Sequence, residues 1–338
     1  MMTPKERLFA RLAGGKVDRV PNLSIVMLFA AQYAGIPYGR FASDYRSLVE
    51  AQTRTAVDFG LDILSTMSDP FRETADFGAR VTFPEDDLPR CETLLLDEAG
   101  DWKELKPFDP LASGRILDRI RAVELFKRQM GEEYPILGWV EGPWAEFNDL
   151  ASVGEGMMML YDEPEEVAAA LDFLAEQATR CALAQVEAGA DIIGMGDAVA
   201  SLVNAEMYRG LFMPAEKKVI DAVHSRGAKV KLHICGNINH LLPDMVATGA
   251  DIIDIDYMVD YEKAIQLAVG KCSICGHINP AQVILQGTPE DVAQWTTYCV
   301  EKGDCRSIVS SGCEVPKLTP PENLRAIDRT LRRIAGLA

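Results

Sequence analysis

The sequence is short of positive charge and of long apolar runs. Its 338 residues include 34 lysines and arginines against 51 aspartates and glutamates, which gives a formal net charge of −17. Nucleic acids and anionic membranes bind clustered positive charge, so the composition argues against both kinds of partner. No stretch reaches the roughly 20 apolar residues that cross a bilayer, and residues 1–7 contain no apolar signal core. We therefore expect a soluble, cytoplasmic protein.

A disulfide framework is also missing. Eight cysteines are spread along a long chain instead of being clustered in a small one, which favours reduced thiols with some of them used as metal ligands. They are Cys91, Cys181, Cys235, Cys272, Cys275, Cys299, Cys305 and Cys313. With 48% hydrophobic residues, the chain can bury one large core or two ordinary ones.

No glycine-rich phosphate loop follows the first apolar run, because residues 21–37 contain none, and this argues against an open doubly wound sheet. Apolar runs instead predict eight strands, nearly all followed by helices. The expected strands are residues 20–27, 62–65, 134–140, 191–195, 230–234, 251–255, 271–275 and 307–310. Strict alternation with short connections predicts parallel strands closed into a (β/α)8 TIM barrel, an α/β fold, forming a single domain over residues 1–338.

The alternation breaks once, at residues 73–105. This segment splits into short alternating pieces with Pro84, Pro89 and Gly100 between them. It predicts a β-hairpin insertion after the second strand, lying over one end of the barrel.

In such a barrel, reactive side chains collect at the carboxyl ends of the strands. His233 and Cys235 end the fifth strand at positions i and i+2, so both leave the same face and one ion can contact them. A thiolate beside an imidazole suits zinc better than magnesium or calcium. Cys313 is the predicted third ligand because Gly312 lets its loop turn inward, and Asp256, which follows the sixth strand, is either a fourth ligand or a helix cap.

Two more acids and a rival metal motif reach the same end of the barrel. Glu141 follows the third strand and Asp197 the fourth, so each can act as a general acid or base, orient a metal ligand, or cap a loop. The rival motif spans residues 272–277, where Cys275 and His277 could pair. It is the weaker candidate, because a C-x-x-C on a strand points its cysteines to opposite faces.

Together the motifs resemble the uroporphyrinogen decarboxylase-like superfamily, and most closely its zinc-dependent, corrinoid-linked methyltransferase branch. The resemblance runs over nearly the whole chain. Its most specific part is the His-x-Cys-Gly of residues 233–236 with the Gly-Cys of residues 312–313 before the Thr-Pro-x-x-Asn of residues 319–323; residues 18–21, 141–143 and 276–280 add to it.

This resemblance implies a (β/α)8 barrel that binds zinc through His233, Cys235 and Cys313. It also implies that the cobalamin (corrinoid) arrives on a separate corrinoid protein, because no corrinoid-binding domain is recognisable in the chain. Cobalamin-independent methionine synthase has a similar ligand set, and Asp256 falls where its glutamate would lie. Asn237, in the first motif, and Tyr257, beside Asp256, are the candidate cofactor-binding residues.

Two departures from the family pattern bear on the reaction. Residues 22–27 lack the arginines with which true decarboxylases of the superfamily grip porphyrinogen carboxylates. Thiol-methylating members continue Gly-Cys-Gly, whereas this chain has Gly312-Cys313-Glu314, a variant similar to the methyl-ether-cleaving members. The resemblance therefore predicts O-demethylation: transfer of a methyl group from a small methyl ether, of the methoxy-aromatic kind, to the corrinoid of a partner.

The alternatives remain open at this point. One is transfer from a methyl-corrinoid to a thiol, as with coenzyme M, or to tetrahydrofolate. Others are a uroporphyrinogen decarboxylase-type decarboxylase and a non-enzymatic corrinoid or metal carrier. A homodimer is an open alternative to a monomer.

Overall fold

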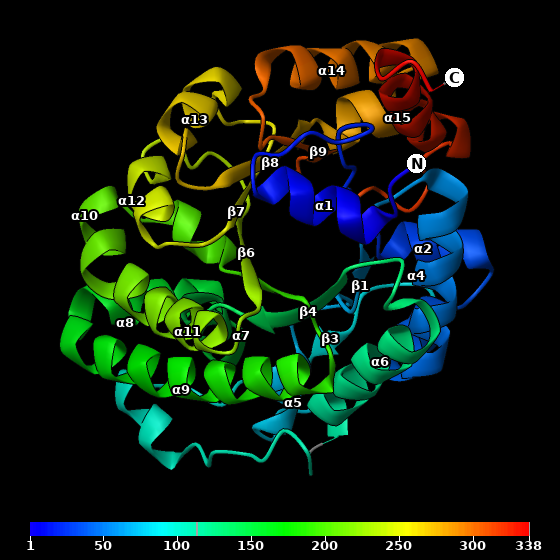
Figure 1. Ribbon diagram of the computed structural model, residues 1–338. Coiled ribbons are helices and arrows are strands. Elements are labelled where there is room, and N and C mark those ends of the chain that lie inside the picture. Colours follow the sequence, from blue (N-terminus) through cyan, green and yellow to red (C-terminus); the bar gives the residue numbers. More distant parts are fainter. Residues whose placement is uncertain (113, 338) are drawn as a thin grey trace.

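Seven parallel strands form a curled sheet in the order β1-β4-β5-β6-β7-β8-β9, with helices around its outside (Figure 1). The structure is a computed structural model that describes residues 1–112 and 114–337. The sheet strands are β1 (Leu64–Ser65), β4 (Ile136–Glu141), β5 (Ile192–Gly196), β6 (Lys229–Ile234), β7 (Ile252–Ile255), β8 (Ser273–Ile278) and β9 (Ile308–Ser311). The predicted α/β barrel is confirmed.

The eighth member of the barrel is an extended segment, and the predicted strand at 20–27 is wrong as a strand. Asn22 makes a single parallel bridge to Val309 of β9, and the Leu23 N–H donates to the Val309 carbonyl. On the other side, the Asp62 N–H donates to the Asn22 carbonyl, which closes the ring toward β1. The ladder stops because Pro21 has no N–H and because Asn22 Oδ1 accepts the backbone N–H of Ser24 in a local turn.

Most of the α-helices pack on the outer face of the sheet, whereas α1 contributes Leu8 to the cluster inside the barrel, and several helices were not predicted. The α-helices are α1 (Pro4–Leu12), α2 (Leu28–Ala34), α3 (Tyr38–Ser43), α4 (Tyr45–Phe59), α5 (Arg72–Asp76), α6 (Gly114–Met130), α7 (Pro143–Ala151), α8 (Val153–Asp162), α9 (Pro164–Ala188), α10 (Ala205–Met207), α11 (Met213–Ser225), α12 (Leu242–Ala247), α13 (Tyr261–Ala268), α14 (Pro289–Lys302) and α15 (Pro321–Ile334). Short 3-10 or π segments η1 (Ala99–Glu104), η2 (Ala198–Leu202), η3 (Tyr208–Phe212) and η4 (Pro280–Leu285) lie between them.

Sequence reasoning misplaced helix starts where side chains compete for the backbone. The sequence from residue 238 to 247 indicates a helix, but α12 begins at Leu242, because Asn237 Oδ1 accepts the N–H of Asn239 and holds a turn there. The helices of 28–43 and 143–162 were missed. Within residues 1–112 and 114–337, no helix has the length and apolar character needed to cross a membrane.

The expected hairpin insertion is present in residues 73–105. Its strands are short: β2 (Val81–Thr82) pairs antiparallel with β3 (Arg90–Cys91). The connection between them is tied to the far end of the chain, because Lys317 Nζ donates to the Asp86 carbonyl. The insertion thereby covers the carboxyl end of the barrel.

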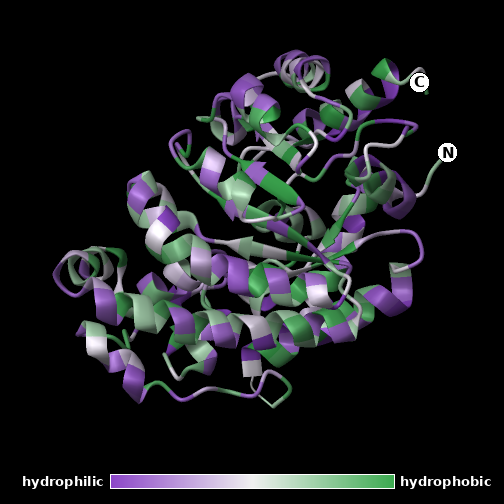
Figure 2. Ribbon diagram, turned by 60° about the vertical axis from the view of Figure 1, so that its left-hand side comes forward, coloured by the Kyte–Doolittle hydropathy of each residue, from purple (hydrophilic) through white to green (hydrophobic). Residues whose placement is uncertain are grey.

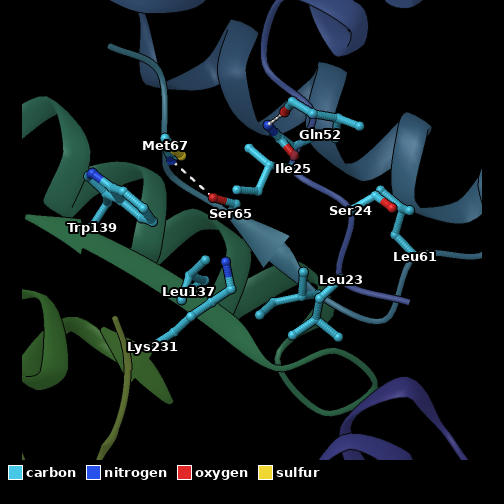
Figure 3. Close-up of a pocket in the computed structure, with 12 residues that line it drawn as sticks. Leu23, Ser24, Ile25, Gln52, Leu61, Ser65, Met67, Leu137, Trp139 and Lys231 are labelled. Atoms are coloured by element: carbon cyan, nitrogen blue, oxygen red, sulfur yellow. Dashed lines mark hydrogen bonds between the residues drawn. The ribbon is translucent and has the colours of Figure 1, made fainter. Parts of the chain in front are cut away.

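The apolar core has two layers. An inner cluster fills the barrel, and a larger one lies between strands and helices, so that helices alternate green and purple along their length (Figure 2). The inner cluster consists of Leu8, Leu23, Ile63, Leu137, Trp139, Ile192, Ile252, Cys275 and Ile308. Above it, a small cavity of about 10 Å³ is lined by apolar side chains, two serines, Gln52 and Lys231, a charged residue inside the barrel (Figure 3).

Candidate active site

Three thiol and imidazole groups predicted as metal ligands meet at the carboxyl end of the barrel. His233 Nε2 lies 2.9 Å from Cys235 Sγ and 3.9 Å from Cys313 Sγ, and the two sulfurs are 3.6 Å apart. The β6 register pairs His233 with Gly196 of β5 and Asp254 of β7, which fixes the imidazole at the rim of the barrel. Cys313 arrives in the loop after β9.

A close approach of loops brings Cys313 inward. Gly312 passes so near the loop after β7 that an added Cβ would lie 2.6 Å from the Tyr257 nitrogen, so only glycine fits. On the other side, Gly236 adopts φ +86°, which turns the chain directly after Cys235. Steric constraints on the backbone therefore explain why both predicted motifs contain a glycine.

The donor set fits zinc. Tetrahedral zinc bonds of about 2.1 Å to nitrogen and about 2.3 Å to sulfur place neighbouring donors about 3.5 to 3.8 Å apart. The observed separations bracket those values, and all three donor atoms lie within 4.8 Å of one another. A hydrogen bond from Cys235, with the charge of His233, lowers the pKa of Cys313 to about 4 against the effect of burial. The group therefore already favours a thiolate.

A carboxylate–lysine pair that sequence reasoning missed lies behind His233. Asp254 Oδ2 is 2.8 Å from His233 Nδ1 and accepts from Lys231 Nζ at 2.5 Å, and all three side chains are at most 3% exposed. Burial raises the pKa of Asp254, but the charges of Lys231 and His233 outweigh it and lower that pKa to about 2. A carboxylate in this place fixes the tautomer in which Nε2 faces the two sulfurs.

The three ligand residues open onto a cavity of about 190 Å³. Its wall is largely apolar and is completed by the hairpin insertion through Leu88. The lining residues are Ile25, Met27, Met67, Asp69, Pro70, Leu88, Trp139, Glu141, Gly196, Ala198, His233, Cys235, Cys313 and Glu314. Glu314 was named only as a departure from the family pattern, and it turns out to line the cavity with Oε1 accepting from the Leu28 N–H at 2.7 Å.

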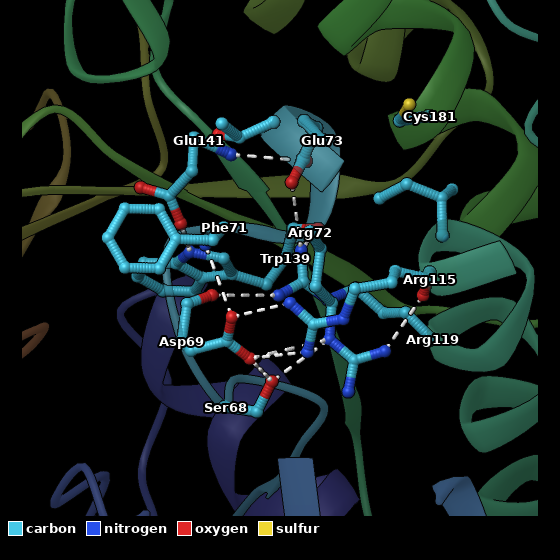
Figure 4. Close-up of polar contacts among 12 residues, drawn as sticks. Ser68, Asp69, Phe71, Arg72, Glu73, Arg115, Arg119, Trp139, Glu141 and Cys181 are labelled. Atoms are coloured by element: carbon cyan, nitrogen blue, oxygen red, sulfur yellow. Dashed lines mark hydrogen bonds and ion pairs between the residues drawn. The ribbon is translucent and has the colours of Figure 1, made fainter. Parts of the chain in front are cut away.

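Glu141, a predicted catalytic residue, lies in this cavity. Its Oε1 accepts from Trp139 Nε1 at 2.8 Å, and its backbone N–H donates to Glu73 (Figure 4). Burial, with the nearby charges of Asp149 and Glu73, raises the pKa of Glu141 well above its usual value. Its surroundings therefore favour the protonated carboxyl.

Asp197, the other predicted catalytic residue, is fully buried and is not among the cavity-lining residues. Its Oδ1 accepts from the Ala145 N–H at 2.7 Å, so it holds the start of α7. Burial raises the pKa of Asp197 to about 7 against its hydrogen bonds with the backbone and Glu216. The arrangement gives it a loop-holding role.

Asp256 is not brought into the ligand group. Its Oδ2 accepts from the Gly236 N–H at 2.9 Å and its Oδ1 from the Tyr257 N–H at 2.7 Å. Both oxygens thus bind backbone next to the two ligand loops. As a fourth zinc ligand it remains a prediction.

The two predicted cofactor-binding residues lie on the exposed rim. Asn237 Oδ1 accepts from the backbone and side chain of Asn239, and the Tyr257 side chain is 42% exposed. The rival pair stays apart: Cys275 is buried in the inner cluster, whereas His277 stacks on Tyr261 with ring centroids 4.6 Å apart. Burial lowers the pKa of His277 to about 4, as expected for a packed, neutral imidazole.

Comparison with known proteins gives one family and two kinds of relative. The family described as uroporphyrinogen decarboxylase (URO-D) matches residues 3–334. The chain is 29% identical over 332 residues to the methylcobamide:CoM methyltransferase MtbA of Methanosarcina acetivorans, and 30% identical over 332 residues to the MtaA enzyme of Methanosarcina barkeri (strain Fusaro). Each match covers 96% of both chains. A uroporphyrinogen decarboxylase of Synechococcus sp. is 30% identical over 241 residues, 67% of this chain and 65% of its own.

Solved structures support the fold. A methyltransferase from Methanosarcina mazei superposes with a TM-score of 0.90 at 23% identity, over 99% of each chain. A B12-independent methionine synthase from Shewanella sp. W3-18-1 superposes with a TM-score of 0.61 at 13% identity, over 94% of this chain and 97% of that one. The family match and the methylcobamide:CoM methyltransferase relatives, together with this fold, confirm the resemblance to the corrinoid methyltransferase branch.

Proposed function

The chain belongs to the uroporphyrinogen decarboxylase family, and from this premise we propose that it is a zinc-dependent methyltransferase that moves a methyl group from a methylated corrinoid on a partner protein to a small thiol. The relatives that match over 96% of the chain are named methylcobamide:CoM methyltransferases, and these names favour methyl transfer from a corrinoid to a thiol over the ether cleavage expected from the Cys313-Glu314 sequence. The observation that carries the proposal is the convergence of His233, Cys235 and Cys313 on one point at the cavity floor.

The residues of the chain divide the work. His233, Cys235 and Cys313 would hold zinc, which as a Lewis acid lowers the pKa of a thiol and makes it a nucleophile at neutral pH. Asp254 orients the imidazole of His233. The apolar wall of the cavity excludes water from the sulfur of the substrate, and the exposed rim beside Tyr257 leaves the mouth open to a partner.

The thiol must lose its proton as the carbon–sulfur bond forms. We assign the proton to Glu314, because its carboxyl lines the cavity beside Cys313. Burial raises the pKa of Glu314 to about 7, whereas it raises the pKa of Glu141 well above normal with no cation to offset it fully, so Glu314 is the better acceptor. The methyl group is transferred as a cation equivalent: the bonding electron pair stays with the corrinoid, and the thiolate sulfur supplies the pair for the new carbon–sulfur bond. The transfer therefore needs no external oxidant or reductant.

The test is S-methylation by the purified, zinc-loaded protein with methylcobalamin and 2-mercaptoethanol. We expect a methyl thioether by mass spectrometry and about one zinc per chain. Cys313→Ala should lose the zinc and at least about a hundredfold in rate. Cys305→Ala is the matched control, because Cys305 is an exposed thiol outside the cavity. Full zinc and full activity in Cys313→Ala would refute the proposal.

A second candidate, the methyl-ether demethylation, keeps one observation in its favour. Glu141 is a protonated acid in the cavity wall, which is the group needed to protonate a departing alkoxide or phenolate. If the zinc-loaded protein methylates a reduced corrinoid from a methoxy-aromatic compound and methylates no thiol, this candidate replaces the first. In that case Glu141→Gln should lower the rate more than Glu314→Gln.

A further inference from the structure

We propose that the thiol used by this protein is small and carries no negative charge: a neutral or cationic thiol, and not a sulfonate or carboxylate. The inference rests on the proposed function and specifies its substrate class. It comes from the charges around the cavity and from the size of the cavity.

The charged and acidic groups of the cavity wall are carboxyls, of which Asp69 is paired with Arg115 and Glu141 has a raised pKa. Asp69, Glu141 and Glu314 reach this wall, and among the residues that the structure places there no lysine or arginine is found. The remaining polar contributions come from the ligand group itself. An anionic tail would therefore meet carboxyl groups and apolar side chains.

Two arginines behind the wall are already bound to carboxylates. Arg115 donates to both oxygens of Asp69, at 2.7 and 2.9 Å, and to the Ala42 carbonyl (Figure 4). Arg72 is fully buried and bonds Ser68, Asp118 and two backbone carbonyls. Neither guanidinium has its charge free for a ligand.

The amine of Lys231 is likewise paired with a carboxylate. Its amine lies 2.5 Å from Asp254 and faces the 10 Å³ void inside the barrel, which is too small for a substrate group (Figure 3). A buried anion without a cationic partner is strongly disfavoured, because it loses its hydration and gains no compensating charge.

Size and the remaining lining point the same way. A volume of about 190 Å³ is below the roughly 300 to 1,000 Å³ of sites for drug-sized ligands, so only a molecule of few heavy atoms fits. Met27, Met67 and Trp139 offer an apolar wall for a short carbon chain. The carboxyls of the wall also favour an ammonium group over a sulfonate.

The experiment uses three thiols of equal chain length and different charge: 2-mercaptoethanol, 2-mercaptoethylamine and 2-mercaptoethanesulfonate. With methylcobalamin as donor and zinc-loaded protein, we expect kcat/KM for the neutral or cationic thiol to exceed that for the sulfonate by at least about tenfold. Calorimetric binding of the three S-methylated products gives the same order without depending on turnover.

A charge-placing variant sharpens the test. Leu88 lines the cavity from the hairpin and is 36% exposed, so Leu88→Lys adds a cation to the wall with little risk to the core. We expect Leu88→Lys to shift the preference toward the sulfonate at least about tenfold, and Leu88→Met, the matched control, to leave it unchanged. A wild-type preference for the sulfonate overturns this inference and leaves the methyl-transfer function standing, whereas no methylation of any thiol overturns that function itself.

Discussion

Buried carboxyls lie on two sides of the same end of the barrel, and their surroundings shift their pKa values in opposite directions. On the β6–β7 side, the charges of Lys231 and His233 lower the pKa of Asp254 to about 2 against burial. On the β4–β5 side, burial raises the pKa values of Glu141, Glu146 and Glu216 well above normal.

The difference comes from the number of cations. Asp254 has a lysine and an imidazole for one carboxylate. The acids near Glu73 share the guanidinium of Arg119, which lies 3.5 Å from Glu73 Oε2 (Figure 4). An ionised carboxylate orients a metal ligand, whereas a protonated carboxyl bridges backbone groups and other acids. The carboxyl with a lowered pKa thus lies beside the predicted metal ligands, and the carboxyls with raised pKa values lie on the other side of the barrel.

Removing the charge of Asp254 should have the largest effect on the difference between the two sides of the barrel. Asp254→Asn leaves Lys231 buried without its counter-charge, so the free energy of unfolding should fall by about 3 to 5 kcal/mol. The imidazole of His233 loses its orienting partner, and zinc affinity should fall about tenfold to a hundredfold. Chelator competition measures the affinity and urea unfolding measures the stability.

Asp256→Asn is the matched control for that variant. Its carboxylate contacts the backbone of Gly236 and Tyr257, and asparagine can keep one of these bonds. Zinc affinity should therefore change by less than about threefold. An equal loss of affinity in both variants would mean that Asp256 is the fourth ligand after all.

The β4–β5 side is tested by the pH dependence of stability. The folded pKa of Asp197 is raised to about 7, so its contribution is fully present below the unfolded pKa and is lost as pH rises through 7. The pKa of its partner Glu216, whose carboxyl accepts from the Tyr208 hydroxyl at 2.5 Å, is also raised. We expect the free energy of unfolding to fall by on the order of 2 kcal/mol between about pH 5.5 and 8.

Glu216→Gln should flatten that profile. With one carboxyl replaced by an amide, Asp197 can ionise while it accepts a hydrogen bond, so the proton is no longer required. The measurement is urea unfolding across the same pH range. A profile as steep as the wild type would show that these acids are not the source of the pH dependence.

The sequence predicted the metal-ligand candidates beside Asp254 better than the acids of the β4–β5 side, for a physical reason. Ligand chemistry is carried by few residue types, so His233, Cys235 and Cys313 were identified individually, and the parallel strand ends gave them a common location. Asp254 was missed although it interrupts an apolar strand, where a charged residue needs a buried partner; Lys231, two positions before His233, offered the same signal.

The acids of the β4–β5 side gave no such signal. Glu146 and Glu216 are compatible with ordinary polar helix faces. Glu146 lies on the unpredicted helix α7, and Glu216 lies on α11, which packs on α9. The segment at 20–27 was overcalled for a similar reason: its apolar residues are buried as predicted, but the Asn22 turn replaces the ladder. Both errors concern where polar side chains bond, which periodicity does not encode.

The smallest effects are expected at the exposed rim, outside both groups of carboxyls. Asn237 bonds only to Asn239 among the residues described. Asn237→Ala should therefore change zinc affinity by less than about twofold and the free energy of unfolding by less than about 1 kcal/mol.

Tyr257→Ala removes an exposed ring beside the mouth. It should raise KM for a corrinoid carried on a protein more than KM for free methylcobalamin, because only the protein-bound corrinoid covers the rim. Steady-state kinetics with both donors measures this. Equal changes for the two donors would place Tyr257 in contact with the corrin itself, and no change for either would remove it from the cofactor-binding residues.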